Sequence, residues 1–419
     1  MEILAEASTP VSDAERITFR YECWRAVASG IIESASVTFL LFIAVKYFAA
    51  GANAKALVAG GGYFGMILSP LVVYWVASRG WNGPRVSAFC CLVGAVFFAA
   101  AALLHSLAIF VAGSVLGLIC SSMFAPLLTQ LYQDHFPGER RGRLFSMTVM
   151  IRIAAIIVFG LAGGRLLDVN LDWFPVVLWS LCAAMLTSAF CLARCPACIL
   201  NREGHTSPFK GLIHVRDDAL FRQTLISWML MGFANLMMVQ LRVEYMANPK
   251  YGKPFDADQT AMLTLVIPNV ARLLLSPVWG RLFDRMNFFT LRIILNVGFA
   301  LGAVAFLAGR DMVSLTIGAI VFGISNAGGD VAWTLWVTKI APPDRVAEYM
   351  SVHTFLFGLR GVFAPLFAFN MVTHWSFTAL SVVAAALIAA ASLLLLPEIF
   401  SGRVNRPIVP DALPENIPE

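Results

Sequence analysis

Charged residues are scarce in this sequence: they make up 13% of its 419 residues, whereas hydrophobic residues make up 59%. A soluble globular domain is about a quarter charged and about half apolar. A chain of 45.6 kDa with a mean hydropathy of +0.77 cannot bury that excess in a core and still present a surface to water. The scarcity of charge therefore excludes a soluble protein and predicts an integral membrane protein.

The sequence also lacks the motifs of a metal site, a nucleotide-binding domain or a nucleic-acid interface. Cys195-x-x-Cys198 is a lone pair of cysteines, whereas structural zinc takes four ligands. Gly60–Gly65 fits the pattern G-x-G-x-x-G but lies inside an apolar run, where small residues serve helix packing. The chain has no contiguous basic face and no His-Glu-x-x-His pairing. We therefore expect no enzymatic activity, no metal, no cofactor and no nucleic-acid partner.

Long apolar runs dominate what is present. A helix that crosses a membrane needs about 20 consecutive apolar residues, and the sequence contains twelve such runs. This pattern predicts an all-α membrane protein with twelve transmembrane helices. The predicted spans are 23–48, 56–78, 84–105, 107–133, 143–167, 173–194, 219–246, 259–283, 289–309, 312–339, 346–372 and 375–397.

One connection is much longer than the others, and it divides the spans into two groups of six. The polar residues after Arg194 and before Ala219 form this connection, and part of it has the pattern of a short amphipathic helix at 208–218. We expect two pseudo-symmetric six-helix bundles. The predicted segments are an N-terminal cytoplasmic segment (1–21), a first bundle (22–195), a cytoplasmic linker (196–218), a second bundle (219–398) and a disordered cytoplasmic tail (399–419).

The distribution of basic residues predicts the orientation. With the N-terminus placed in the cytoplasm, 20 of the 30 Lys and Arg residues, including Arg292, fall on cytoplasmic segments. Seven, including Arg242, fall outside, and three lie within the membrane. Cytoplasmic loops carry an excess of Lys and Arg in membrane proteins. Both termini are therefore expected in the cytoplasm, and the protein is expected to be a multi-pass protein of the inner (plasma) membrane.

The two groups of spans also show an internal repeat. Ser69-Pro70 aligns with Ser276-Pro277 at an offset of 207 residues. In the first helix of each group, Gly30 aligns with Gly232 and Glu33 with Asn235 at an offset of 202. Two parallel six-helix repeats with a site between them form a transporter architecture.

A loop motif between the eighth and ninth spans carries a family resemblance. It reads Gly280-Arg281-Leu282-Phe283-Asp284-Arg285 and is followed by Arg292. With this motif, the repeat and the topology, residues 20–398 resemble the major facilitator superfamily. The resemblance implies a monomeric secondary transporter that works by alternating access, with Gly280, Asp284 and Arg285 in a cytoplasmic gate motif; a role in topology alone is the alternative for the arginines.

Departures from the family pattern leave the subfamily open. The counterpart motif between the second and third spans keeps Arg79 and Arg85 but lacks the Gly, Asp and Arg expected before them. The fifth span reads Gly160-Leu161-Ala162-Gly163-Gly164, without the proline that proton-driven drug antiporters of the family usually carry there. The resemblance therefore identifies the superfamily and not the substrate.

Five ionisable residues lie well inside the spans. They are Glu33, Arg152, Arg272, Asp330 and Arg360. Each would cost about 2.5–3.5 kcal/mol at a helix centre facing lipid, so we expect them to face a cavity or one another in a layer near the midplane. Structural ion pairing within each half is the alternative to a role in substrate or proton handling.

We assign expected roles within this layer by charge. Glu33 is the first candidate for the proton carrier and Asp330 the second, because a carboxyl group in a low-dielectric site can exchange a proton. Neighbouring polar and aromatic side chains are further candidates, each of which could equally serve helix packing. The substrate-binding candidates are Arg152, Arg272, Arg360, Tyr63, Gln130, Asn235 and Trp333.

These roles predict what the protein carries. Three arginines against two acids favour a small anionic or zwitterionic organic solute, because guanidinium groups bind carboxylates and phosphates. With no ATP-binding motif in the sequence, the expected partners are this solute, protons or another coupling ion, and the lipid bilayer. A multidrug/proton antiporter and a lipid or lysolipid translocator are the alternative functions.

Overall fold

The computed structural model describes residues 12–200, 212–251, 255–309, 311–341 and 346–401. Within these residues, twelve helices are long and apolar enough to cross a membrane, and they correspond one by one to the twelve predicted spans. The predicted all-α fold is thus confirmed for the described part of the chain. Residues 1–11, 201–211 and 402–419 lie outside the described residues, so the predicted linker helix (208–218) is described only from 212 onward, where a short helix is present.

Six spans form the N-terminal half. The first is a continuous helix that begins at Asp13, about ten residues before the predicted start of the apolar run, since Ser12 caps it by accepting from the backbone N–H of Glu15. The elements are α1 (Asp13–Ser34), η1 (Ala35–Phe39), α2 (Leu40–Lys46), α3 (Ala52–Arg79), α4 (Gly83–Leu103), α5 (Leu107–Ser122), α6 (Ala125–His135), α7 (Gly138–Val169), η2 (Leu171–Trp173) and α8 (Phe174–Arg194).

The other six spans form the C-terminal half, which follows the short helix α9 (Ile213–Asp217). Asp218 caps the first of them by accepting from the backbone N–H of Phe221. The elements are α10 (Ala219–Ala247), η5 (Pro249–Tyr251), α11 (Ala257–Ala261), η6 (Met262–Val266), α12 (Ile267–Arg285), α13 (Phe288–Ala308), α14 (Met312–Leu335), η7 (Trp336–Lys339), α15 (Val346–Met371) and α16 (Phe377–Ser401).

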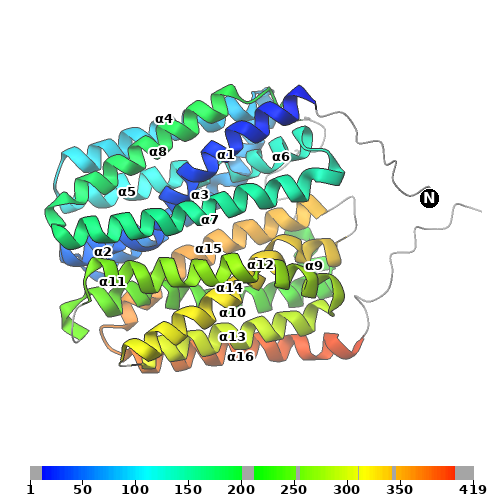
Figure 1. The fold of residues 1–419 in the computed structure, drawn as a ribbon. Coiled ribbons are helices and arrows are strands. Elements are labelled where there is room, and N and C mark those ends of the chain that lie inside the picture. The colour runs from blue at the N-terminus through cyan, green and yellow to red at the C-terminus, as the bar shows by residue number, and fades with distance from the viewer. Residues whose placement is uncertain (1–11, 201–211, 252–254, 310, 342–345, 402–419) are drawn as a thin grey trace, which may run out of the picture.

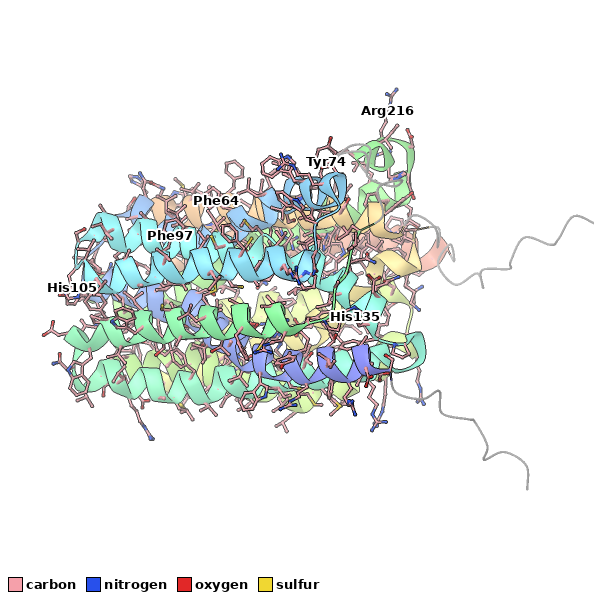
Figure 2. All side chains as sticks on the ribbon, turned by 90° about the horizontal axis from the view of Figure 1, so that it is seen from above. Phe64, Tyr74, Phe97, His105, His135 and Arg216 are labelled. Carbon is pink, nitrogen blue, oxygen red and sulfur yellow. The ribbon has the colours of Figure 1, made fainter. Side chains whose placement is uncertain are left out.

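The two halves lie side by side as separate bundles, and both ends of the chain leave from the same end of the molecule (Figure 1). We call this the terminal end and the other the opposite end. Figure 2 shows His105 at the opposite end and Arg216 at the terminal end. The halves meet chiefly where α3 packs on α15 and where α7 packs on α11, η6 and α12. Any site between the halves is therefore lined by these helices and by α1.

Buried polar pairs join the halves towards the opposite end. Nζ of Lys55 on α3 lies 2.5 Å from Oε1 of Glu244 on α10. Asn248 donates to the same carboxylate oxygen over 2.8 Å. Both charged side chains are almost completely buried. Because a buried charge without its partner is strongly destabilising, this pair holds the two halves together at the opposite end.

Two π-helical turns face each other across the same interface. One is η1, which interrupts the first span, and the other is η6, which interrupts the eighth. The hydroxyl groups of Thr38 in η1 and Thr264 in η6 are hydrogen-bonded at 2.9 Å, and both side chains are buried. Single π-helical turns inside α-helices are frequent at functional sites.

Candidate functional site

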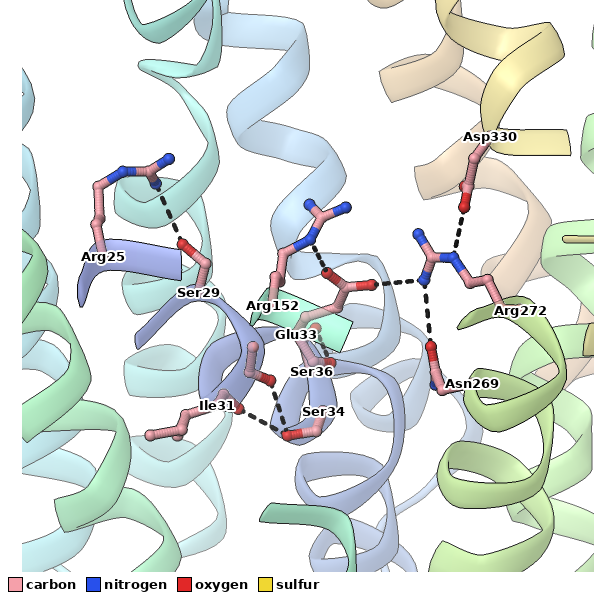
Figure 3. Close-up of polar contacts among 11 residues, drawn as sticks. Arg25, Ser29, Ile31, Glu33, Ser34, Ser36, Arg152, Asn269, Arg272 and Asp330 are labelled. Carbon is pink, nitrogen blue, oxygen red and sulfur yellow. Dashed lines mark hydrogen bonds and ion pairs between the residues drawn. The ribbon is translucent and has the colours of Figure 1, made fainter. Parts of the chain in front are cut away.

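A chain of ion pairs crosses the interface between the halves (Figure 3). Glu33 on α1 lies between two arginines: its Oε2 is 3.4 Å from Nε of Arg152 on α7, and its Oε1 is 3.5 Å from Nη1 of Arg272 on α12. Nε of Arg272 donates to Asp330 on α14, and Nη1 of Arg272 also donates to Oδ1 of Asn269 over 3.3 Å. The order Arg152–Glu33–Arg272–Asp330 thus links both halves through one carboxylate.

The four charges balance, but they are not all held equally tightly. Charge-assisted hydrogen bonds usually span about 2.7–2.9 Å, and both contacts of Glu33 are longer. Nε of Arg152 forms an ion pair with Glu33 without an aligned hydrogen bond. The side chains of Glu33 and Arg152 are 32% and 34% exposed, although they lie well inside their helices. The ion pair between Glu33 and Arg152 is therefore loose and partly accessible.

A glycine brings the two helices of this pair together. A Cβ atom on Gly30 would lie 2.5 Å from the carbonyl oxygen of Arg152 and 2.7 Å from Cβ of Ala155. Only glycine permits so close an approach of α1 to α7. Since Gly30 lies three residues before Glu33, it sets the distance between Glu33 and Arg152.

Arg360 lies apart from these four residues. Its Nη1 donates to the backbone carbonyl of Trp228, and its guanidinium lies 4.8 Å from the ring of Phe357. Arg360 is 4% exposed, and within the described residues no acidic side chain forms an ion pair with it. The expected layer of five charges is thus a group of four at the interface and one arginine inside the C-terminal half.

The remaining substrate-binding candidates lie in different surroundings. Tyr63 packs on Phe357 with the ring centroids 5.3 Å apart. Trp333 is half-buried and packs on the same Phe357 at 5.6 Å. Asn235 is half-buried on α10. Gln130 donates to Asp134 on its own helix over 2.6 Å, so the structure does not bring it to the charged group.

The gate-motif residues lie in the last turns of α12, at the terminal end of the molecule. A Cβ atom on Gly280 would meet no atom within 4 Å, and Arg285 is exposed as the last residue of the helix. The side chain of Asp284 lies outside the described residues, so its role in a gate stays a prediction. Arg292, which is predicted on the cytoplasmic side, is buried, with 1% of its residue exposed.

Sequence reasoning missed the buried pair of Lys55 and Glu244 and treated Arg242 as an outside residue. Arg242 is buried, with its guanidinium 3.9 Å from the ring of Phe322. A signal was present, because Arg242 and Glu244 both lie inside the predicted span 219–246. Ionisable residues within a span mark interior positions even near its end.

Nothing in the described residues forms a metal site: no group of three or more His, Cys, Asp or Glu residues could hold an ion there. Cys195 and Cys198 are buried and carry free thiols.

Comparison with known proteins agrees with this architecture. Residues 220–412 match the sequence profile of the Major Facilitator Superfamily. No curated protein sequence shows significant similarity to the chain.

Solved transporter structures share the fold over most of their length. The nucleoside transporter NupG superposes with a TM-score of 0.70 at 14% identity, over 93% of this chain and 100% of that chain. The inward-open xylose transporter XylE from E. coli superposes with a TM-score of 0.67 at 15% identity, over 90% of this chain and 95% of that chain. The human organic anion transporter MFSD10 superposes with a TM-score of 0.65 at 14% identity, over 91% of this chain and 99% of that chain.

These identities are low, so the superpositions establish the fold. The family match covers the C-terminal half, and the fold covers both halves. Together they support the broad functional prediction, a multi-pass secondary transporter. The predicted resemblance is thus confirmed: the chain has the Major Facilitator Superfamily fold, and its C-terminal half matches the family profile.

Proposed function

We propose that this protein is a secondary active transporter that moves a small anionic or zwitterionic organic solute across the inner membrane together with protons. One observation carries the proposal. Glu33 joins an arginine of one half to an arginine of the other through two long, partly exposed contacts. A solute that replaces Glu33 between these arginines changes both the charge of Glu33 and the connection between the halves.

The arginines define the class of solute. Arg152 and Arg272 offer donors from opposite sides of the interface, and guanidinium groups bind a carboxylate or a phosphate bidentately. Asp330 lies beside Arg272 and can receive a positively charged group of the same solute. An anionic or zwitterionic solute therefore matches the donors and acceptors of the site.

Glu33 supplies the coupling to protons. While it lies between Arg152 and Arg272, its negative charge is stabilised by both. When a solute anion takes its place, the carboxylate loses these partners in a low-dielectric site and binds a proton more readily. Anion and proton therefore bind together, which is the requirement for symport.

Alternating access requires the opposite end to open. In this conformation the pairs Lys55–Glu244 and Thr38–Thr264 hold the halves together there, while Glu33 and Arg152 are partly exposed. We propose that this state is open towards the terminal end, and that rocking of the halves breaks these pairs. The excess of basic residues on the segments at the terminal end supports a cytoplasmic position for that end.

Transport by the purified protein in proteoliposomes tests the proposal. The panel contains small carboxylates, organic phosphates, zwitterions, lipophilic cations and lysolipids, each with and without an imposed pH gradient. We expect a pH gradient to drive accumulation of a carboxylate, phosphate or zwitterion. Arg152→Gln should raise the KM for that solute by roughly tenfold.

Arg165→Gln is the matched control, because Arg165 lies on the same helix but is exposed. It should leave the KM unchanged. Transport of lipophilic cations alone would support a multidrug antiporter instead, and movement of lysolipids alone would support a lipid translocator. Either result would overturn the proposed solute class.

A further inference from the structure

The C-terminal half buries a group of polar atoms that have no hydrogen-bond partner within the described residues. Three of these atoms are Nε, Nη1 and Nη2 of Arg292, and a fourth is Nε of Arg360. The others are the ring nitrogens Nε1 of Trp228, Trp333 and Trp336 and Nε2 of His353. We call these six residues the Arg292 cluster. Every member except Trp333 is at least nine-tenths buried.

Contacts between the side chains show that these atoms belong to one place. The guanidinium carbon of Arg292 lies 3.3 Å from the centroid of the Trp228 ring, and Arg360 donates to the backbone carbonyl of the same Trp228. The ring of His353 lies 5.3 Å from that of Trp228 and 5.2 Å from that of Trp336. The ring of Trp333 lies 5.5 Å from that of His353, so the cluster joins α10, α13, α14, η7 and α15 in the interior of the half.

Most of these atoms can only donate hydrogen bonds. Guanidinium and indole nitrogens are donors only, and arginine stays protonated in proteins. Burying a donor without an acceptor is costly, and burying a charge without a counter-charge costs more. Within the described residues, no carboxylate pairs with Arg292 or Arg360. The missing partner is thus an acceptor that carries negative charge.

The N-terminal half shows that the fold does not require this arrangement. The internal repeat aligns Arg292 with Arg85, which is exposed. In the fifth helix of the N-terminal half, Arg152 pairs with Glu33. The residue aligned with Glu33 in the C-terminal half is Asn235, which carries no charge. Two unpaired arginines are therefore a property of the C-terminal sequence.

The packing limits the size of the missing partner. Three aromatic rings pack against His353, 5.2–5.5 Å from it, centroid to centroid, and this close packing favours a small partner. On the side of the terminal end, Phe221 stacks on Trp336 at 5.6 Å and Tyr349 packs on Phe221 at 4.4 Å. These rings cover the cluster and separate it from solvent.

We propose that the Arg292 cluster binds a resident small inorganic anion of the chloride class. The anion accepts hydrogen bonds from the guanidinium of Arg292 and from neighbouring donors, and it compensates the buried positive charge. The proposal does not depend on the identity of the transported solute. It predicts a protein whose C-terminal half is stabilised by halide.

Thermal unfolding of the purified full-length protein tests the proposal. The probes are sodium chloride, sodium bromide, sodium phosphate and sodium gluconate, at equal ionic strength and pH. We expect chloride and bromide to raise Tm by about 3 °C or more relative to gluconate, because a ligand that binds only the native state stabilises it. Phosphate, which is larger, should act like gluconate.

Two variants locate the effect. Arg292→Gln should abolish the dependence of Tm on halide, whereas Arg85→Gln, at the aligned and exposed position, should retain it. If Arg292→Gln does not fold, bromide in crystals of the unaltered protein provides the second measurement, with an anomalous peak expected in contact with the Arg292 guanidinium. Equal Tm values in chloride and gluconate, an undiminished halide effect in Arg292→Gln, or no bromide peak there would overturn the proposal.

Discussion

Glu33→Gln should abolish proton-driven uptake while exchange of labelled for unlabelled solute continues. Glutamine keeps the shape of the side chain, and its one oxygen can still accept from Arg152 or Arg272, but it cannot carry a proton. Uphill uptake in a pH gradient should fall by about 100-fold or more. Exchange needs only that the loaded site alternates between the two sides, so its rate should stay within about threefold of that of the unaltered protein.

Asp13→Asn is the control for this variant, because Asp13 lies on the same helix and is exposed near its start. It should leave both uptake and exchange unchanged. Uptake driven by the pH gradient is measured in proteoliposomes, and exchange is measured in the same vesicles with solute on both sides and no gradient. Equal loss of both activities would show that Glu33 serves structure or solute binding and not coupling.

A disulfide between positions 38 and 264 should stop transport. The hydroxyl oxygens of Thr38 and Thr264 are 2.9 Å apart across the two halves. Cysteine sulfurs at these positions can come within bonding distance, because a C–S bond is longer than a C–O bond and an S–S bond is about 2.05 Å. If the halves must separate here, oxidised Thr38→Cys/Thr264→Cys should lose more than about 90% of its exchange rate.

The double variant needs two comparisons. Reduction with dithiothreitol should restore its exchange rate, and each single cysteine variant should be unaffected by oxidation. These comparisons also account for the eight native cysteines. Full exchange by a protein whose cross-link is verified by mass spectrometry would mean that the halves do not part at this contact.

The helices were predictable because a membrane span is specified locally. A run of about 20 apolar residues has few other stable arrangements, and all twelve predicted spans have counterparts in the described residues. The start of the first helix was not predictable from hydropathy. It lies at Asp13 because Ser12 caps a polar helical extension of the apolar run.

The pairing of the charges could not be predicted from sequence alone. Depth within a helix indicated that Glu33, Arg152, Arg272 and Asp330 must find partners, and the structure brings them together. Which charges meet depends on how the halves pack, and hydropathy contains no such information. The separation of Arg360 from this group follows from its bond to the Trp228 carbonyl, which is also a tertiary contact.

Not every basic residue near a helix end is a simple signal of orientation. Positive charges near helix ends indicate orientation, yet Arg242 and Arg292 are buried against aromatic rings. Both side chains are long enough to point back into the bundle from near a helix end.

Proton uptake on solute binding is the most direct test of the central claim, that the solute displaces Glu33 from its arginines. A pH-sensitive dye reports protons taken from a weakly buffered solution when the solute from the transport panel is added to the purified protein. The account predicts an uptake of up to about one proton per solute bound, since the displaced carboxylate becomes protonated, and none in Glu33→Gln. Proton release, no change, or an equal uptake by Glu33→Gln would contradict it.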